Sequence, residues 1–468
     1  MDRTELYIAG QWVAPRATET IAVENPVTET VLGHVPAGSP SDVDAAVAAA
    51  RAAFPAWAAL SQAERGAHLD RLHAALSARK ELIAQTVARE VGTPMKVAQR
   101  VQTELPLTVL RGYADATADE PEIVGNSLVV REPVGVVGAI TPWNYPLHQL
   151  MAKVSAALSA GCTVVAKPAE LSPLVAFVFF DAVHEAGLPP GVVNLVSGKG
   201  SEAGAALAAH SDVDMVSFTG STAVGAEISR LAAGRIARVA LELGGKSANV
   251  ILDDADLVKA VKVGVGNAFL NAGQTCTAWT RMLVHRSRYG EALEIAAASA
   301  EGYTMGDPFD EATRLGPVIS ARQRERVRSF IAQGLDGEVR VIAGGLSAKV
   351  PDFGYFVPGT VLADVDPQSV VAQEEIFGPV LAVIPFDTDE EAIAIANNTK
   401  YGLAGAVWSS DVDRALAVAR RMRTGAVDIN GAAFNPLAPF GGFKQSGFGR
   451  ELGRHGLSEF LEVKAIQR

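Results

Sequence analysis

Cys276 is the residue of this chain whose type and position best suit covalent chemistry. It is one of only two cysteines among 468 residues. It lies in the small, polar segment 271–278, directly after the apolar stretch 263–270. A cysteine on such a turn can act as a nucleophile through its thiolate. The alternative is a small buried side chain, which is how most free cysteines behave.

Two further residues could complete a site for carbonyl chemistry. Glu242 is the only ionisable residue in the apolar stretch 239–245. Burial without a partner raises the pKa of a carboxyl group, which suits a general base near neutral pH; the alternative is a salt bridge to Lys246. Asn144 lies in the proline-bracketed turn 142–146, and a rigidly held amide N–H is the donor that an oxyanion needs.

Glycine-rich turns at two successive strand-to-helix junctions could bind a pyrophosphate. The strict G-x-G-x-x-G fingerprint of dinucleotide-binding proteins is absent, because residues 198–204 have too wide a second gap and FTGS at 218–221 with Gly225 is a different pattern. Each segment alone could be an ordinary turn. Together, glycines and Ser221 at these junctions could let a phosphate approach the N–H groups of a helix N-terminus.

Acidic residues near the same junctions bear on the type of cofactor. Lys167 and Glu170 follow the apolar run 162–166, where they could project over the carboxyl end of a sheet rather than form a solvated turn. Glu170 would then accept a hydrogen bond from a ribose hydroxyl and repel a 2′-phosphate, which favours NAD over NADP. Phe377, beside Glu375, could pack on a planar cofactor ring, although a charged pair such as 374–375 is usually solvated.

The elements that must hold these residues alternate between strands and helices. Short apolar runs predict buried strands, and the segments between them have the spacing of helices. The predicted strands are 136–140, 162–166, 192–196, 215–218 and 239–243, and the predicted helices are 147–160, 173–186, 202–209 and 222–233. Such alternation predicts a parallel sheet covered on both faces, with ligands at the carboxyl ends of its strands.

The same alternation resumes after the Gly244-Gly245 pair and predicts a second α/β domain. Its strands are expected at 249–252, 281–285, 339–343, 380–384, 404–408 and 426–429, and its helices near 256–270, 288–302, 320–333, 388–397 and 411–422. A further helical region, 61–91, precedes the first sheet. The fold class is therefore α/β with two doubly wound domains.

Two segments, 122–132 and 461–466, fit neither domain. The first is extended with polar flanks, and the second alternates apolar and charged residues. Strands without a partner often pair across a subunit boundary. We therefore expect an oligomer in which these segments form a small β element.

Composition argues against several classes of partner. The formal net charge of -11 disfavours binding to nucleic acid or anionic membranes. No secretory signal and no run of ~18 apolar residues is evident, so a cytoplasmic protein is expected. The eight histidines show no metal-ligand spacing, so no metal site is expected.

The ordered motifs of the chain resemble those of the NAD(P)-dependent aldehyde dehydrogenase superfamily, in its hydrolytic, non-acylating branch. They are PWNYP at 142–146, KPAE at 167–170, FTGS at 218–221, ELGGK at 242–246, GQTCTA at 273–278, EEIFGPV at 374–380 and PFGGFKQSGFGRE at 439–451. Each motif alone is weak. The ordered set is specific and spans nearly the whole chain.

This resemblance implies an oxidoreductase that converts an aldehyde to its carboxylic acid. Cys276 would attack the carbonyl to give a thiohemiacetal, and Asn144 with the Cys276 N–H would stabilise the oxyanion. Hydride transfer to NAD, or NADP as a possible alternative, would leave a thioester. Glu242 would activate the water that hydrolyses it, and Lys153 with Glu451 matches a pair linked to that base.

The resemblance also implies two sets of binding residues. The cofactor set is Ile140, Trp143, Lys167, Glu170, Phe218, Gly220, Ser221, Gly225, Leu243, Glu375 and Phe377. The substrate set is Tyr145, His148, Gln149, Ala152, Leu270, Trp279, Phe434 and Phe440. Trp279 departs from the small residues usual at its position, whereas Ala152 leaves room and His148 and Gln149 add polarity. A longer or polar-ended aldehyde is therefore the hypothesis.

The family forms homodimers or homotetramers of three-domain subunits. By resemblance, residues 1–118 and 134–244 would form the NAD-binding domain, 245–446 the catalytic domain, and 119–133 with 447–468 the oligomerisation element.

Alternatives remain open for the activity. A coenzyme A-acylating relative needs no hydrolytic base at Glu242, a cofactor-independent cysteine esterase needs a histidine base near Cys276, and a catalytically silent protein needs none of these groups.

Overall fold

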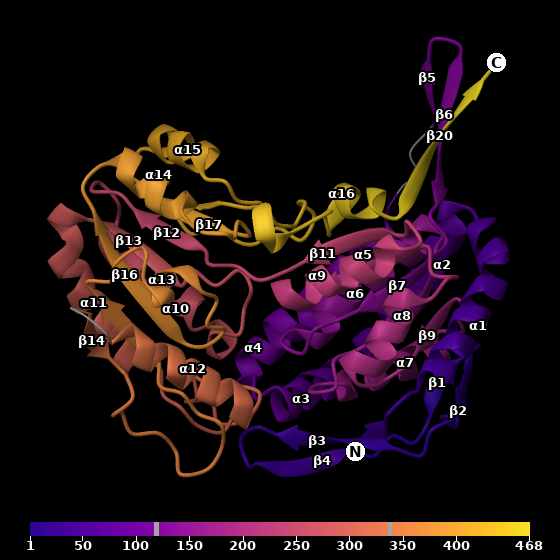
Figure 1. Ribbon diagram of the computed structural model, residues 1–468, viewed down its shortest axis with the longest axis horizontal. Helices are drawn as coiled ribbons and strands as arrows, with labels where there is room; N and C mark the ends of the chain where they lie inside the picture. The colour runs from indigo at the N-terminus through magenta and orange to yellow at the C-terminus, as the bar shows by residue number, and fades with distance from the viewer. Residues whose placement is uncertain (117–120, 336–338) are drawn as a thin grey trace.

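The computed structural model describes residues 1–116, 121–335 and 339–468, and it shows two α/β lobes side by side with a slender sheet projecting from one of them (Figure 1). Both lobes contain a mainly parallel sheet, so the predicted fold class is confirmed. Within the described residues, no helix has the length and apolarity needed to cross a membrane.

The first lobe is built on an eight-stranded sheet in the order β19-β11-β10-β7-β8-β9-β1-β2. Its five central strands are parallel and lie within one residue of the predicted bounds: β7 (Val136–Ile140), β8 (Thr163–Lys167), β9 (Val193–Leu195), β10 (Met215–Thr219) and β11 (Arg238–Glu242). Apolar strands of this kind are typical of sheets buried on both faces. The strand order reverses between β7 and β10, which is where ligands bind on such sheets.

Helices cover both faces of this sheet. Residues of α1, α8 and α9 pack on one face, and α2, α3, α5, α6 and α7 pack on the other. The bounds are α1 (Pro40–Ala58), α2 (Gln62–Ser77), α3 (Lys80–Glu90), α4 (Met95–Gln99), the π-helical turn η1 (Arg100–Glu104), α5 (Leu105–Ala114), α6 (Pro146–Ala160), α7 (Leu174–Glu185), the π-helical turn η2 (Gly200–Gly204), α8 (Ala205–Ala209) and α9 (Thr222–Ala233).

The helical region predicted at 61–91 is divided in two. The chain leaves the helix at Ala78 and Arg79, where the Arg79 guanidinium donates to the Ala75 carbonyl and pairs with Glu185. The helices after Pro94 were not predicted. They contribute the α5 face that packs on α6.

The second lobe contains a seven-stranded sheet in the order β14-β15-β16-β13-β12-β17-β18. The strands are β12 (Ala248–Ile251), β13 (Arg281–His285), β14 (Arg340–Ala343), β15 (Thr360–Ala363), β16 (Val380–Phe386), β17 (Gly405–Trp408) and β18 (Asp428–Ile429), all parallel to their neighbours except β14. Its helical elements are α10 (Leu257–Ala268), η3 (Leu270–Gly273), η4 (Arg286–Arg288), α11 (Tyr289–Glu301), α12 (Ala321–Gly334), α13 (Val370–Gln373), α14 (Asp389–Asn397) and α15 (Val412–Arg421).

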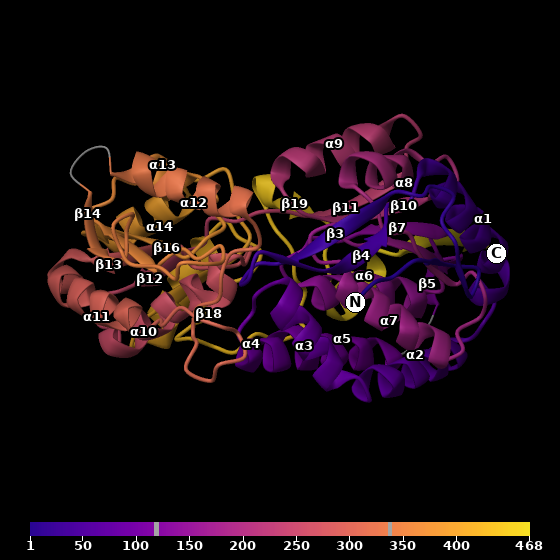
Figure 2. The same ribbon diagram turned by 90° about the horizontal axis from the view of Figure 1, so that it is seen from below.

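The N-terminal strands join the two lobes. The strands β1 (Leu6–Ile8) and β2 (Gln11–Val13) extend the first sheet, and the hairpin β3 (Thr20–Asn25) and β4 (Thr30–Pro36) runs toward the second lobe (Figure 2). There the Pro26 carbonyl accepts the Tyr355 N–H at 2.9 Å, and the Glu29 carboxylate accepts the Gly354 N–H at 2.9 Å.

The two segments that fit neither predicted domain pair with each other. The strand β6 (Ser127–Pro133) lies between β5 (Glu122–Val124) and β20 (Leu461–Gln467) in the projecting sheet. The expected small β element is therefore formed, and its role in joining subunits stays a prediction. Residues 117–120, at the predicted start of this element, lie outside the described residues.

The C-terminal segment also returns to the first lobe before it reaches β20. The strand β19 (Gly447–Phe448) hydrogen-bonds with β11. It follows η5 (Lys444–Ser446), and α16 (Gly453–Ser458) packs on α6.

The division of the chain into the three predicted domains stays a prediction. The two glycines 244 and 245 lie in the connection from β11 to β12.

Candidate active site

Cys276 lies on a tight loop that precedes β13. Asn271 and Ala272 have φ values of 52° and 56°, and Gly273 has 71°. A Cβ at Gly273 would lie 2.1 Å from the Gly378 carbonyl oxygen, so only glycine fits there. Left-handed backbone at non-glycine residues costs energy and persists where the surroundings enforce it. The nucleophile candidate is therefore on a strained, constrained turn.

Two contacts from the first lobe and one close approach of the connection between the lobes hold this loop. The Asn144 amide donates to the Gln274 carbonyl at 2.9 Å, and the Tyr145 and Thr275 hydroxyls lie 2.7 Å apart. A Cβ at Gly245 would lie 2.4 Å from the Cys276 carbonyl oxygen. The predicted residues Asn144, Tyr145 and Cys276 are thus brought together across the two lobes.

Asn144 is itself held by a buried network. Its backbone carbonyl accepts the Asn271 side-chain amide at 3.0 Å, and the Asn271 oxygen accepts the Thr93 hydroxyl at 2.7 Å. Gln102 donates to Thr93 at 2.7 Å. An amide NH₂ has two donors, and the bond to Gln274 occupies one of them. The second makes no hydrogen bond within the described residues.

The Cys276 thiol lies among negatively charged side chains. Burial, then the charges of Glu375 and Glu242, raise the pKa of Cys276 to about 12. The residue itself remains partly exposed. The other cysteine, Cys162, is fully buried and donates to the Phe460 carbonyl at 3.4 Å. Of the two cysteines, Cys276 is therefore the one placed to meet a substrate.

Glu242 ends β11 and is 4% exposed. Within the described residues its Oε2 has no hydrogen-bond partner, and a Cβ at Gly441 would lie 2.7 Å from its Oε1. Burial, then the charge of Glu451, raises the pKa of Glu242 well above the usual range. The Lys246 amine is likewise buried with no hydrogen-bond partner in the described part of the chain, so the alternative of a Glu242–Lys246 salt bridge is wrong.

Lys153 connects the neighbourhood of Glu242 to the C-terminal segment. Its amine donates to the Thr219 hydroxyl at 2.7 Å and forms an ion pair with Glu451. Lys153 is 1% exposed and Glu451 is 5% exposed. A buried ion pair of this kind requires both partners. The pair anticipated by resemblance is thus formed, with Thr219 as an additional member.

The predicted cofactor residues of β7, β8 and β10 share one edge of the first sheet. Ile140 is in register with Lys167 and with Phe218 at the carboxyl ends of these strands. Glu170 accepts the Gly200 N–H at 2.9 Å, and its carboxylate lies 3.5 Å from the Lys167 amine. A lysine and a carboxylate are therefore present where a ribose would bind.

The start of α9 lies close to the edge of the first sheet. Ser221 caps this helix by accepting the Val224 N–H at 3.4 Å. A Cβ at Gly225 would lie 2.6 Å from Leu243, and one at Gly220 would lie 2.4 Å from the Phe218 ring. These glycines let the helix N-terminus approach the sheet edge. Such an end attracts anions through its free N–H groups and its dipole.

The remaining cofactor residues lie at the boundary between the lobes. Glu375 accepts the Gly245 N–H at 3.0 Å, and a Cβ at Gly244 would lie 2.1 Å from its carboxylate. The rings of Trp143 and Phe377 meet edge to face with centroids 5.3 Å apart. Phe377 has a φ of 61°. Glu375, Phe377 and Trp143 thus lie together at this boundary, and their contact with a cofactor stays a prediction.

The predicted substrate residues fall into three places. Tyr145, His148, Gln149 and Ala152 follow one another on α6, at or beside its N-terminus, and the His148 Nδ1 and Gln149 Oε1 atoms are buried without partners among the described residues. Phe434 and Phe440 have ring centroids 6.2 Å apart, and the Leu270 carbonyl accepts the Thr275 hydroxyl at 3.1 Å. Trp279 is 3% exposed, within the second lobe's core. Substrate contacts of these residues stay predictions.

Several residues of the site were not singled out from the sequence. Thr219, Asn271 and Thr275 lie inside or beside the recognised motifs, so their proximity to these motifs could have identified them as site residues. Gly441 lies in the PFGGFKQSGFGRE motif, but nothing in the sequence pairs it with Glu242. Thr93 and Gln102 are distant in sequence and carry no such signal.

The comparison with protein families decides the class of this site. The model of the aldehyde dehydrogenase family matches residues 12–466. This chain belongs to the aldehyde dehydrogenase family. The resemblance stated from the motifs is thereby confirmed.

Individual members of the family match this aldehyde dehydrogenase over nearly their whole length. A 3-succinoylsemialdehyde-pyridine dehydrogenase of a Pseudomonas species is 47% identical, with 99% of this chain and 98% of that protein covered. The geranial dehydrogenase of Castellaniella defragrans is 42% identical, with 100% and 99% covered.

Solved structures agree with the fold described above. Aldehyde dehydrogenase C of Pseudomonas syringae, a cysteine-to-alanine mutant with NAD+ and octanal, is 47% identical at a TM-score of 0.97, with 99% of this chain and 96% of that chain covered. The NAD+ complex of a Bacillus cereus aldehyde dehydrogenase is 41% identical at a TM-score of 0.95, with the same coverage.

Proposed function

We propose that this aldehyde dehydrogenase uses Cys276 and Glu242 to oxidise an aldehyde to its free carboxylic acid with NAD+. The observation that carries the proposal is the convergence on Cys276 of an amide donor and a buried carboxyl group from the other lobe. Asn144 contacts the cysteine loop directly, and the charge of Glu242 acts on the Cys276 thiol.

The first role of these residues is to form and stabilise a covalent adduct. As the Cys276 S–H bond breaks and its proton passes to water, the sulfur attacks the aldehyde carbonyl carbon, and the oxygen gains negative charge. The free N–H of the Asn144 amide and the Cys276 backbone N–H act as donors to that oxygen. Because the buried network around Asn271 fixes Asn144, the donor is oriented before the charge develops.

The second role is to release the product. When bound, NAD+ supplies the hydride acceptor that converts the adduct to a thioester. Glu242 then takes a proton from a water molecule, and the resulting hydroxide attacks the thioester carbon. A base of raised pKa holds this proton effectively near neutral pH. Hydrolysis returns the Cys276 sulfur and releases the acid.

The residues of the first sheet favour NAD+ as the cofactor. Lys167 and Glu170 would hold the adenosine ribose, Ser221 and the α9 N-terminus the pyrophosphate, and Glu375 with Phe377 the nicotinamide ribose and ring. The Glu170 carboxylate, near the Lys167 amine, would repel a 2′-phosphate. The solved relatives from Pseudomonas syringae and Bacillus cereus contain NAD+, which supports this choice.

A medium-length or polar-ended aldehyde is the proposed substrate class. Ala152 leaves space on α6, and His148 and Gln149 present polar atoms that have no partner within the described residues. Relatives are named for geranial and for a pyridine semialdehyde, and one was crystallised with octanal. These names support an aldehyde larger than acetaldehyde.

One screen tests the function and the substrate class together. NADH and NADPH formation is measured with acetaldehyde, octanal, geranial and an aromatic semialdehyde, and the acid product is quantified with and without coenzyme A. We expect free acid, NAD+ preference, and a higher kcat/KM for the larger aldehydes. Turnover without cofactor would support the esterase, and acyl-coenzyme A formation would support the acylating branch. Cys276→Ala is the inactive control.

The projecting sheet supports a homodimer or homotetramer. It stands away from both lobes (Figure 1) and carries exposed apolar side chains, among them Ile123 at 63%, Val124 at 54% and Val463 at 66% exposure. Exposed apolar patches of this kind mark interfaces. Light scattering after size-exclusion chromatography tests the state, and a monomeric mass would contradict it.

A further inference from the structure

A continuous set of hydrogen bonds between buried side chains leads from the helical region after Pro94 to Asn144. The Gln102 amide donates to the Thr93 oxygen at 2.7 Å, and the Thr93 hydroxyl donates to the Asn271 Oδ1 at 2.7 Å. The Asn271 amide donates to the backbone carbonyl of Asn144 at 3.0 Å. We propose that Thr93 and Gln102 are positioning residues, which orient the oxyanion donor Asn144 through Asn271. The inference rests on the proposed function.

The Thr93 hydroxyl determines which way the Asn271 amide faces. A hydroxyl group has one proton. Because Gln102 already offers an N–H to the Thr93 oxygen, that proton is donated to Asn271. The Asn271 oxygen therefore faces Thr93, and its NH₂ group faces the Asn144 carbonyl. Without the hydroxyl, the closest donor to this oxygen would be the Gln102 amide at 3.5 Å, and the Asn271 amide would be free to turn over.

Asn271 contacts both the backbone of Asn144 and the group that holds its side chain. The Asn144 amide donates to the Gln274 carbonyl at 2.9 Å, and the Gln274 amide donates to the Asn271 carbonyl at 3.1 Å. A rotation of Asn271 would therefore shift the oxyanion donor without any contact with the substrate. A displacement of about 1 Å in a catalytic group can cost about 10²-fold in rate.

The backbone beside Thr93 is held by the second lobe. The Met95 N–H donates to the Pro308 carbonyl at 2.9 Å. A Cβ at Gly316 would lie 1.9 Å from the Gly92 carbonyl oxygen, so the two chains pass each other without a side chain between them. The position of the oxyanion donor thus depends on the contact between the lobes.

Gln102 lies in the π-helical turn η1, between α4 and α5. Such turns occur frequently at functional sites. Gln102 is fully buried, and its Oε1 has no hydrogen-bond partner in the part of the chain that the structure describes. A buried acceptor without a partner costs stability. An apolar side chain at this position would avoid that cost but could not donate to Thr93.

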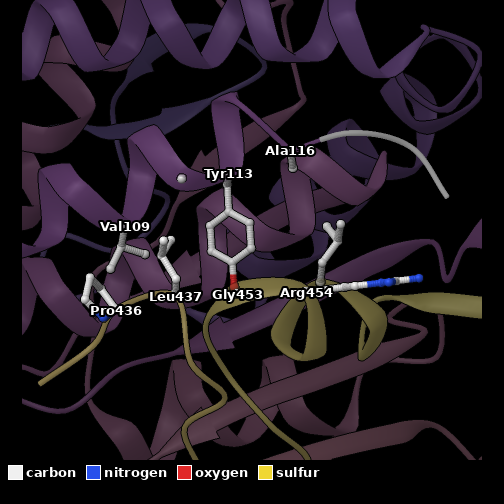
Figure 3. Close-up of a pocket in the computed structure, with 9 residues that line it drawn as sticks. Val109, Tyr113, Ala116, Pro436, Leu437, Gly453 and Arg454 are labelled. Carbon is white, nitrogen blue, oxygen red and sulfur yellow. The ribbon is translucent and has the colours of Figure 1, made fainter.

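The helix that follows η1 also lines a surface pocket. This pocket has a volume of about 260 Å³ and lies between α5, which contributes Val109 and Tyr113, and residues of the C-terminal segment that include Leu437 and Arg454 (Figure 3). None of the four side chains from Gln102 to Asn144 lines it. The positioning bonds are thus made between protein groups away from this pocket, and substitutions are the direct test.

Thr93→Val tests the proposal because valine keeps the shape of threonine and removes the hydroxyl group. The full-length enzyme, in excess over aldehyde, is mixed with saturating NAD+, and NADH formation is followed through a single turnover by stopped flow. Loss of an oxyanion donor typically costs about 10²–10³-fold, so we expect its misplacement to slow this step about tenfold. The KM for NAD+ should stay unchanged, and Thr93→Ser, which keeps the hydroxyl, should restore the rate.

The same substitution in the Asn144→Ala background separates positioning from a general structural role. If Thr93 acts through Asn144, Thr93→Val should add less than about twofold to the loss in that background, because residues in one network are not additive. An equal tenfold loss in both backgrounds would overturn the proposal. A Thr93→Val rate equal to that of the parent would also overturn it. Gln102→Met removes the donor to Thr93 and allows the same comparison if Thr93→Val does not fold.

The matched control is Thr86→Val. The Thr86 hydroxyl is equally buried but donates to the Leu82 carbonyl within α3 at 2.7 Å. This variant should keep the parent's rate, and a loss equal to that of Thr93→Val would overturn the proposal. Failure of the proposed function is distinguishable, because Asn144→Ala alone would then form NADH as fast as the parent.

Discussion

Replacing Glu242 by glutamine separates the two halves of the proposed reaction. Glutamine matches the shape of the side chain in a site where Gly441 leaves little room. It cannot take a proton from water. Removal of a general base typically costs about 10²–10⁴-fold, so we expect steady-state turnover to fall by this factor. Thiol attack and oxidation of the adduct do not need the base, and NADH should therefore appear as a single burst.

The assay is stopped-flow measurement of NADH with aldehyde in excess. In the Glu242→Gln variant, the burst amplitude should match the number of Cys276 thiols titrated in the same preparation. Cys276→Ala provides the control and should show neither burst nor turnover. Steady-state turnover within about twofold of the parent would refute Glu242 as the base, since a base contributes far more. Absence of the burst would show that Glu242 acts before hydrolysis.

The same variant makes a prediction about stability. The raised pKa of Glu242 means that, as pH increases above the ordinary value of 4.5, the unfolded chain ionises before the folded protein does. The contribution of Glu242 to stability is therefore complete below that pH and is lost as pH rises toward the folded pKa. A tenfold difference in proton affinity between the folded and unfolded states corresponds to about 1.4 kcal/mol. The Tm of Glu242→Gln relative to the parent should increase from pH 5 to pH 8.

Three further changes test single features of the site. Asn144→Ala removes an oxyanion donor and should lower kcat/KM about 10²–10³-fold, measured by NADH formation at low aldehyde concentration. Gly441→Ala places a Cβ 2.7 Å from the Glu242 carboxyl oxygen and should slow acid release while leaving the NADH burst intact. Glu170→Ala removes the carboxylate beside Lys167 and should lower the NAD+ to NADP+ ratio of kcat/KM about tenfold, since close charges typically contribute roughly 1 kcal/mol or more.

A different experimental result would contradict each of these three predictions. A loss for Asn144→Ala smaller than about tenfold would remove it as an oxyanion donor. An equal loss of burst and acid release in Gly441→Ala would mean that the cysteine loop, rather than the base, has moved. An unchanged cofactor ratio in Glu170→Ala would exclude contact with the 2′ position. Cys162→Ala serves all three assays as a matched silent change, because Cys162 is buried away from the cleft.

The central strands of both sheets could be predicted because strands that are buried on both faces consist of short runs of mainly apolar residues. Runs such as 136–140 and 281–285 are short, apolar and bounded by turns, so their limits were nearly right. The strand β15 is just as buried but was not predicted, and its length is not the reason, because β12 and β17 are also four residues long. The edge strands β1 and β2, of three residues each, were also missed.

The chemical residues could be named from motifs, but their connections could not. Cys276, Glu242 and Asn144 stand out by type and setting. The contact of Asn144 with Gln274 joins residues 130 positions apart, and the Thr93 bond to Asn271 spans 178 positions. No local pattern encodes such pairs. The pairing of 127–133 with 461–467 was likewise invisible, because each segment alone only shows that it needs a partner.

The raised pKa of Cys276 has a consequence for the durability of the enzyme. Burial, together with the charges of Glu375 and Glu242, raises the pKa of Cys276 and so favours the neutral thiol in the resting protein. Peroxides and alkylating agents react with the thiolate, and oxidation beyond the sulfenic acid is irreversible. The carboxylates around the sulfur therefore protect the idle protein from chemical damage.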